Sequence, residues 1–456
     1  MSAREHSLRE RDSPEFDEGG TERPALTAWV MHGTACMSVL LLGANYYGTL
    51  AAARAYGAKG IDVIMADESR SALCLSSRFV TERLTCPKVS DTSSFLRWLM
   101  EQGHAHGGSL VLYPTTDHLA WLFAAHRAEL DQVFRIYHPD EEAIFGLLDK
   151  HRLSLAASAV GLELPFTLVA EPIEKLEQLA RSMKFPILLK PRTQVFLRSG
   201  VKGVLVPSPG ELKEKIAEFL RFTVYEDALR ERHPEVSAPL LQEYLPAAET
   251  SVFSVSGFRT REGVLMARGA MKVLQRPRKL GIGLCFESRP LDSELLEKLS
   301  ALCEKVGYFG TFEAEFIISG SRRLLIDFNP RFYSQMAFDQ ARGLDHALLA
   351  YYSARGQHAQ VAKLLDQAQA WRSKGPEAYC HRGLLELVLG LQGASGRMTR
   401  AQVRHWRDWI VERRPHLIDA TWSRDDPMPA VVDWALWLSR FAHHPRSFVV
   451  HYLLNR

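Results

Sequence analysis

The segment GTFEAEFIISGSRRLLIDFNPRF, residues 310–332, contains two apolar runs separated by a short turn of glycine and serine. Both runs have the composition and length of β-strands, so the segment predicts a hairpin. The second run ends in Asp327, Asn329 and Arg331, each two residues from the next. Residues two apart in a strand point to the same face. The hairpin is therefore expected to present a row of polar side chains at the end of an apolar strand.

Glu315 lies in the first strand of this hairpin, and we expect it to face Asp327. Side chains that face each other across two strands lie about 5 Å apart, so two carboxylates there would repel each other without a cation. The oxygens of Glu315, Asp327 and Asn329 are the hard ligands that suit Mg²⁺. Arg331 offers a planar fork for a phosphate or a carboxylate. The alternative is a polar strand end that faces only solvent.

The composition excludes several classes of protein. The 456 residues are 46% hydrophobic and 24% charged, which is typical of a soluble globular protein with two or three domains. A net charge of +3 gives no sign of nucleic-acid binding. We find no apolar run of about 18 residues, so no membrane span is expected. The six cysteines form no C-x-x-C pair, which argues against a disulfide framework or a zinc site and favours a cytoplasmic location.

The N-terminal third of the chain divides into a tail and an α/β region. Residues 1–25 are rich in charge and poor in apolar side chains, so we predict a disordered tail without a secretion signal. Residues 37–67 read as strand, glycine-containing turn, helix and strand, and residues 109–123 repeat strand, turn and helix. These patterns predict parallel βαβ units, and hence a Rossmann-like domain over residues 26–145.

The rest of the chain predicts two further regions. Residues 146–345 contain short strands joined by turns, which indicates an α+β domain with mostly antiparallel sheets. Residues 346–456 have mainly helical patterns and contain six of the nine tryptophans. We interpret them as a helical region packed on the rest, with the aromatic residues in its core.

Two more strand ends carry candidate binding residues. Lys190 ends the run PILLK and would suit a phosphate as a point charge, although a lysine at a strand end usually faces solvent. The strand at 240–244 runs into a bend at Pro246, whose backbone groups could bind the edge of a purine. Glu249 could then accept hydrogen bonds from ribose hydroxyls. An ordinary turn would have the same sequence.

The order and spacing of these motifs resemble the ATP-grasp superfamily over residues from about 38 to 345, most closely its carboxylate–amine ligase branch. That branch includes carbamoyl-phosphate-synthase-like enzymes and D-aspartate ligases. The resemblance implies a Rossmann-like pre-ATP-grasp domain, an ATP-grasp domain of two α+β lobes and a helical C-terminal region. The motifs that carry it are LLGANYYGTLAAARAYGAKGIDVI (41–64), LYPTTDHLAWL (112–122), LLDKHRL (147–153), GLELPFT (161–167), FPILLKPR (185–192), GVKGV (200–204), LQEYLP (241–246), FEAEF (312–316) and LLIDFNPR (324–331).

The resemblance also implies a role for each candidate residue. Phosphates of ATP would be bound by Lys150 and Lys190, beneath a mobile loop at 192–203. The adenine hinge would be Gln242, Glu243, Tyr244 and Leu245, and the ribose ligand Glu249. Two Mg²⁺ ions, or Mn²⁺ in their place, would be bound by Glu315, Asp327 and Asn329. The transferred phosphoryl group and the acyl phosphate would be stabilised by Arg331. A substrate carboxylate would be bound by Lys272, although a basic hairpin at 271–283 that only faces solvent is the alternative. The family usually has glutamate at the position of Asp327, so the second metal ion would sit differently or bind more weakly.

The function implied is an ATP-dependent ligase that activates a small carboxylate as an acyl phosphate and joins it to an amine. Its partners would then be small molecules, with no nucleic acid and no membrane, and a homodimer is left open. An alternative is a regulatory or scaffold protein that binds ATP but turns it over little, which the unusual Asp327 would suit. A biotin-dependent carboxylase is less favoured, because no Ala-Met-Lys-Met segment is present.

Overall fold

A computed structural model of the chain describes residues 38–171, 176–276, 283–373, 375 and 377–450. These residues belong to one compact unit, Met37–Arg456. The predicted disordered tail at 1–25 lies outside the described residues. In the part of the chain that is described, no helix combines the length and the apolar character that a membrane span needs. The domain boundaries near residues 145 and 345 stay predictions.

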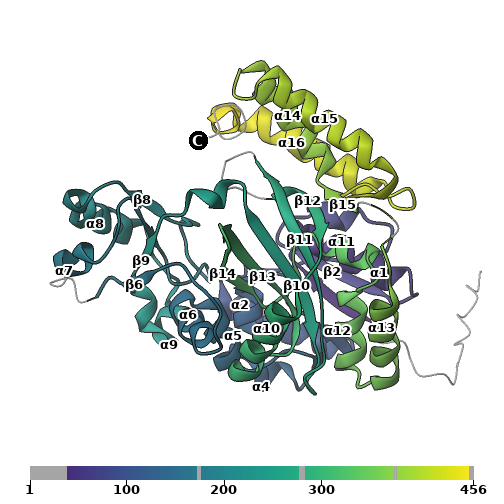
Figure 1. Cartoon of the computed structure of the whole chain (residues 1–456). Coiled ribbons are helices and arrows are strands. Elements are labelled where there is room, and N and C mark those ends of the chain that lie inside the picture. Colours follow the sequence, from purple (N-terminus) through teal and green to yellow (C-terminus); the bar gives the residue numbers. More distant parts are fainter. Residues whose placement is uncertain (1–37, 172–175, 277–282, 374, 376, 451–456) are drawn as a thin grey trace, which may run out of the picture. The chain divides into compact units, whose positions relative to one another are not determined.

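A parallel five-stranded sheet forms the first layer, in the order β3-β2-β1-β4-β5. Figure 1 draws this part of the chain in purple, with β2 labelled. Its strands are β1 Val39–Leu42, β2 Val63–Asp67, β3 Val80–Thr85, β4 Leu110–Leu112 and β5 Phe134–Ile136. The strands β1 and β4 are buried along their whole length, as expected for apolar strands covered on both faces. The direction of winding reverses between β1 and β4, so the loops that follow these two strands lie side by side at the carboxyl edge. The predicted α/β region is confirmed.

A seven-stranded sheet follows, in the order β14-β13-β10-β11-β12-β15-β16. Its strands are β10 Val252–Arg259, β11 Leu265–Gln275, β12 Gly283–Arg289, β13 Gly310–Ser319, β14 Arg322–Asn329, β15 Ala378–Cys380 and β16 Leu417–Asp419. All pairs are antiparallel except β15 with β16. On one face, Phe312, Phe316 and Phe328 are buried in a core that also contains Leu295 and Leu299 of helix α10, Ser293–Val306. The opposite face is therefore free to carry polar side chains.

A smaller antiparallel sheet has the order β6-β9-β7-β8. Its strands are β6 Thr167–Val169, β7 Ile187–Lys190, β8 Val204–Val206 and β9 Leu240–Glu243. Helix α8, Leu212–Phe222, packs Ile216 and Phe219 against Leu189 and Leu241 of this sheet. The two antiparallel sheets confirm the predicted α+β character of the middle of the chain.

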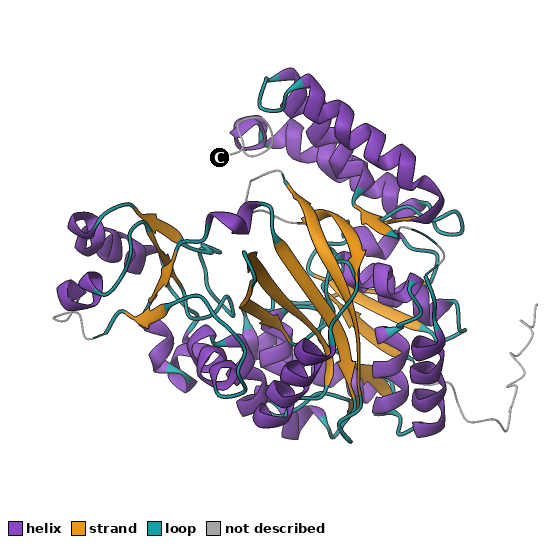
Figure 2. Cartoon of the chain, viewed as in Figure 1, coloured by secondary structure: helices purple, strands orange, loops and turns teal. Residues whose placement is uncertain are grey.

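The C-terminal region is helical, as predicted, but it also contains two strands that the sequence did not indicate. Strands β15 and β16 extend the seven-stranded sheet beyond β12. Each has only three residues, which is too short for an alternating pattern to be recognised. Three helices, α14 Arg382–Ala394, α15 Arg400–Arg413 and α16 Met428–His443, pack together in this region (Figure 2).

The other helices surround the sheets. They are α1 Tyr47–Gly57, α2 Thr92–Ala105, α3 Asp117–Ala125, α4 Arg127–Leu130, α5 Glu141–Leu148, α6 Lys150–Ser158, α7 Leu176–Arg181, α9 Asp227–Arg232, α11 Met336–Ala341, α12 His346–Ala354, α13 His358–Ala370 and α17 Pro445–Phe448. Short 3₁₀ helices are η1 Leu73–Ser76, η3 Pro209–Glu211, η4 Pro234–Ser237, η5 Pro246–Glu249 and η6 Arg414–His416. Several helices begin with an Asp or Thr cap, for example α3 at Thr116 and α6 at Asp149.

Candidate functional site

The polar face of the seven-stranded sheet is organised by the hairpin of β13 and β14. Glu315 lies directly opposite Asp327, as predicted, and Glu313 lies opposite Asn329. The register shifts just beyond Glu315, where Ile326 is the extra residue on β14. Such a bulge re-aims the side chains that follow it, and here it allows Asp327 and Asn329 to share the face of Glu315. The predicted juxtaposition of the two carboxylates is thereby confirmed.

Lys272 on β11 reaches the same face from two strands away. Its Nζ donates to Glu315 Oε1 at 2.5 Å. Burial alone would lower the pKa of Lys272, but the carboxylates of Glu315, Glu313 and Asp327 outweigh it and raise the pKa. Lys272 is thus held as an ammonium group within the carboxylate cluster, and the structure joins it to the predicted metal ligands.

Lys150 brings a second cation to this face from the first turn of α6. Asp149, fully buried, caps this helix by accepting from the backbone N–H groups of His151 and Arg152, at 2.8 and 2.9 Å. The cap fixes the start of the helix, so that Lys150 Nζ donates to Asp327 Oδ1 at 2.6 Å. The side chain of Lys150 is only 14% exposed.

Lys190 ends β7 of the smaller sheet, and its charge acts on the same carboxylates. Burial, together with the repulsion of Lys150, lowers the pKa of Lys190 to about 8, although Asp327 and Glu315 oppose the shift. Burial would raise the pKa of Asp327, but Lys150, Lys190 and Lys202 more than offset it and lower the pKa below its usual range. Two lysines from different elements therefore converge on one aspartate.

Glu313 is a third carboxylate of the cluster, which the sequence analysis missed. It is only 6% exposed, accepts from Ser254 Oγ at 2.6 Å and from the Gln335 amide, and lies 3.4 Å from Asn329 Nδ2. Burial and the charge of Glu315 raise its pKa, while Lys272 opposes them. The signal was present in FEAEF, because residues two apart share a strand face.

Arg331 is held by a residue from the parallel sheet. Its Nε donates to Asp117 Oδ1 at 2.7 Å, and a terminal nitrogen donates to Asn329 Oδ1 at 3.1 Å. Asp117 begins α3, directly after the loop that follows β4. Burial would lower the pKa of Arg331, but Asp117 outweighs this effect and raises it. The fork predicted for a phosphate is therefore already oriented by a carboxylate, and Asn329 is positioned between Arg331 and Glu313.

The predicted hinge residues lie at the end of β9, where it leaves the smaller sheet. The side-chain amide of Gln242 donates to Thr167 Oγ1 at 3.0 Å, and Glu243 Oε1 accepts from the backbone of Phe166 at 2.9 Å. Both side chains thus support the sheet. The predicted hinge continues through Tyr244 and Leu245 into η5, which contains the predicted ribose ligand Glu249. The backbone oxygen of Glu249 accepts from Gln275 Nε2 at 3.3 Å, which ties η5 to β11.

The predicted mobile loop at 192–203 is anchored in its first half. Val195, Phe196 and Leu197 are buried in the main core. Phe196 has a φ of 49°, donates its N–H to His118 Nδ1 at 2.8 Å and stacks on that ring. The Arg192 guanidinium forms two hydrogen bonds with Asp149, at 2.8 and 3.1 Å. Only the later part of the segment, residues 198–203, lacks such burial.

The donor set of the site fits a divalent cation bound together with phosphates. Over the described residues, no group of three or more His, Cys, Asp and Glu side chains is arranged to hold a metal ion by itself. The predicted set consists of two carboxylates and one amide, and Mg²⁺ commonly takes its remaining ligands from phosphate and water. Both carboxylates already attract a cationic group, since Glu315 faces Lys272 and Asp327 faces Lys150.

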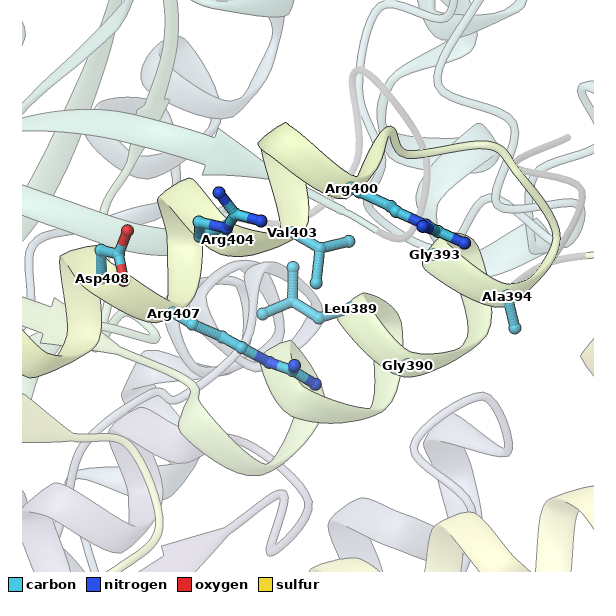
Figure 3. A pocket seen from close by; sticks show the side chains of 9 residues that line it. All are labelled: Leu389, Gly390, Gly393, Ala394, Arg400, Val403, Arg404, Arg407 and Asp408. Atoms are coloured by element: carbon cyan, nitrogen blue, oxygen red, sulfur yellow. The ribbon is translucent and has the colours of Figure 1, made fainter.

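A separate groove lies between α14 and α15 in the C-terminal region (Figure 3). Its volume is about 460 Å³, and none of the predicted site residues lines it. Arg400 and Arg407 extend from α15 toward α14 and line the groove together with Gly390 and Gly393. The groove is thus distinct from the cluster on the sheets.

Three solved structures with a similar fold put this arrangement in context. The biotin carboxylase domain of 2-oxoglutarate carboxylase from Hydrogenobacter thermophilus, a dimer in complex with MgADP, ADP and bicarbonate, is 16% identical (TM-score 0.54; 74% of this chain and 71% of that chain). L-amino acid ligase from Bacillus licheniformis is 12% identical, with a TM-score of 0.51, and the match covers 70% of this chain and 75% of that chain. Phosphoribosylglycinamide synthetase from Anaerococcus prevotii is 13% identical, with a TM-score of 0.52, and the match covers 75% of this chain and 79% of that chain. No family model and no curated protein matches the sequence. At these identities the likeness establishes the fold.

Proposed function

We propose that this chain, which has the fold of the ATP-grasp superfamily, is an ATP-dependent carboxylate–amine ligase. The observation that carries the proposal is the convergence of lysines and carboxylates from two sheets and from helix α6 on one polar face. Lys150 contacts Asp327 at 2.6 Å, and Lys272 contacts Glu315 at 2.5 Å. Two of the similar structures are named a ligase and a synthetase, which supports the same class of reaction.

The charges of the cluster suit a phosphate, because a phosphate can take the place of Asp327 as the anionic partner of Lys150. A nucleotide brings several negative charges, which compete with Asp327 for the ammonium groups of Lys150 and Lys190. When Lys150 turns toward the phosphates, the carboxylate of Asp327 becomes available to a cation, and Glu315 becomes available when Lys272 turns toward the substrate carboxylate. The Mg²⁺ that fits there would neutralise phosphate charge as a Lewis acid when bound.

The chain's other residues position the reactants. A carboxylate oxygen of the substrate would attack the γ-phosphorus of ATP, which forms an acyl phosphate and releases ADP. The amine would then attack the acyl carbon, and phosphate would leave. Arg331, oriented by Asp117, would stabilise the transferred group, and Lys272 would bind the substrate carboxylate. In phosphoryl transfer the protein contributes mainly position and charge, so no nucleophilic side chain is required.

A second candidate function is an ATP-binding regulatory protein with little turnover. The observation in its favour is that Asp327, one methylene shorter than the usual glutamate, is paired with a lysine. A screen for ADP release with paired carboxylates and amines separates the two functions. We expect ADP release that requires both substrates and Mg²⁺. ATP binding without ADP release for any pair would favour the regulatory function and overturn the ligase.

The low pKa of Lys190 predicts that ATP binding weakens at alkaline pH. The pKa near 8 means that the free protein loses this ammonium group as the pH rises through 8, whereas phosphate binding needs the charged form. Titration calorimetry of MgATP between pH 7 and 9.5 should give a Kd that rises by up to about thirtyfold. The control is Lys190→Arg, which stays charged over this range. An equal pH dependence in both proteins would contradict the assignment of Lys190 to the phosphates.

A further inference from the structure

Helix α16 is apolar on both of its sides. One side is packed within the protein, with Val432 and Leu436 against the core of the parallel-sheet region and Trp437 against the core that contains α14. The opposite side carries five large apolar side chains that are 41–66% exposed. They are Met428, Val431, Trp434, Leu438 and Phe441. A helix that is apolar all round is normally covered all round, so this side lacks a partner in the isolated chain.

The exposed side, here called the α16 face, follows the spacing of a helix–helix seam. Its five large residues recur at intervals of three and four positions, and the exposed Ala435 lies among them. This is the pattern by which one helix packs along another, with knobs that enter the gaps of the facing helix. The seam occupies all four turns of α16, over a length of about 24 Å.

The α16 face is held rigidly, because the start of the helix is anchored to the parallel-sheet region. Asp426, 1% exposed, accepts from Arg54 Nε at 2.9 Å and from Ser77 Oγ at 2.8 Å. Arg54 also donates to the backbone oxygens of Thr421 and Asp426, at 2.7 and 2.9 Å. The apolar side chains are thus presented on a fixed helix, so little conformational entropy is lost when they are covered.

We propose that the α16 face is a self-association surface that packs, antiparallel, on the same face of a second copy of this chain. A twofold axis midway between Trp434 and Ala435 brings each exposed apolar position opposite another. Trp434 then faces the small Ala435 of the second copy. By the same symmetry Val431 faces Leu438, and Met428 faces Phe441. Such self-complementarity is what a twofold interface requires, and a different protein would not impose it.

The charges at the two ends of the α16 face favour the antiparallel arrangement. The exposed Arg424 and Asp425 precede the helix and cancel in charge, while His444 and Arg446 follow it and are also exposed. Antiparallel packing brings the neutral end of one copy to the basic end of the other and opposes the two helix dipoles. Parallel packing would bring the basic ends of both copies together. One helix pair is a small interface, so we expect dissociation at about micromolar concentration.

Light scattering after size-exclusion chromatography tests the proposal with the full chain. Wild type at about 100 µM should elute at twice the 51.5 kDa of one chain and dissociate on dilution. Leu438→Glu should be monomeric with an unchanged melting temperature, because Leu438 is 66% exposed in the single chain. The matched control is Val411→Glu in α15, where the exposed fraction is 70%, and it should stay dimeric. A wild-type monomer at 100 µM, or a dimer that Leu438→Glu leaves intact, overturns the proposal.

A cross-linking experiment tests the register. In the antiparallel pair, position 435 and its copy are offset by about 1.5 Å along the helix axis, whereas position 438 and its copy are offset by about 10 Å. Ala435→Cys should therefore form a disulfide-linked dimer under mild oxidation, and Leu438→Cys should not. Both are made with Cys36→Ser, since the five described cysteines are buried. Equal cross-linking of the two variants, or none with Ala435→Cys, overturns the antiparallel register.

Discussion

Replacing Asp327 by asparagine is expected to reduce ADP release by about 10²–10³-fold, the effect of removing one preorganised charged group from a transition state. Asp327 is the residue on which Lys150 and Lys190 converge, and the lysines lower its pKa, so it is ionised at neutral pH. Asparagine keeps the shape and an oxygen for Lys150 but removes the negative charge that Asp327 would contribute to the metal site. Because Asp327 is partly exposed, the melting temperature should change by less than about 3 °C.

Arg331→Lys is the companion variant for this prediction. It keeps the positive charge but loses the fork that binds Asp117 and Asn329, so we expect a loss of about 2–4 kcal/mol of transition-state stabilisation. Measuring ADP release and melting temperature for both variants separates catalysis from structure. If both variants turn over like wild type and only their stability changes, the cluster is a set of structural ion pairs.

Replacing Arg342 by alanine is expected to destabilise the protein by about 3–5 kcal/mol, because the buried charge of Asp339 loses its guanidinium partner. The hydroxyl donors of Ser256 and Tyr333 remain, but they are neutral. Both side chains are at most 2% exposed and form an ion pair. Arg342 also donates to the backbone oxygen of Gly269 at 2.8 Å, and its guanidinium lies 3.9 Å from the ring centre of Phe338. The pair thus joins α11 to β11, and urea unfolding should report its loss as a lower midpoint.

The surface pair of Arg322 and Glu163 is the matched control. Its atoms are 2.8 Å apart, but both side chains are 52% exposed, so Arg322→Ala should cost about 0–1 kcal/mol. The two pairs have a similar chemistry and differ in burial. An Arg342→Ala variant that loses no more stability than Arg322→Ala would show that the buried pair has no special role in the fold.

Much of the polar face could be predicted because it depends on local rules. The turn at Gly320, whose φ of 63° suits glycine, sets the register of the hairpin as far as Phe316 and Leu325, and the strand period places Asp327 and Asn329 on one face. The bulge at Ile326, which brings Asp327 opposite Glu315, follows from neither rule. Glu313 was missed although the same period places it on the same face. Neither the period nor the turn indicates how a buried third carboxylate is accommodated, which depends on Ser254 and Gln335.

Contacts between distant segments could not be predicted from the sequence. Asp117 orients Arg331 from 214 residues away. Asp149, which positions Lys150 by capping its helix, also accepts a hydrogen bond from the distant Arg192. No pattern within one segment encodes such pairs, because they arise only when the sheets are packed. The strands β15 and β16 illustrate the same limit, since each takes its place through pairing with a neighbour rather than through its own sequence.

The most direct test of the proposed nucleotide site is a calorimetric titration of the full chain with ATP, once with Mg²⁺ and once with a chelator. The convergence of Lys150 and Lys190 on Asp327, opposite Glu315, predicts saturable binding of one ATP per chain in the presence of Mg²⁺. Without Mg²⁺ the carboxylates repel the phosphates, so binding should weaken at least tenfold, a difference of about 1.4 kcal/mol. Absence of binding at millimolar ATP with Mg²⁺ would contradict the assignment of this cluster to a nucleotide.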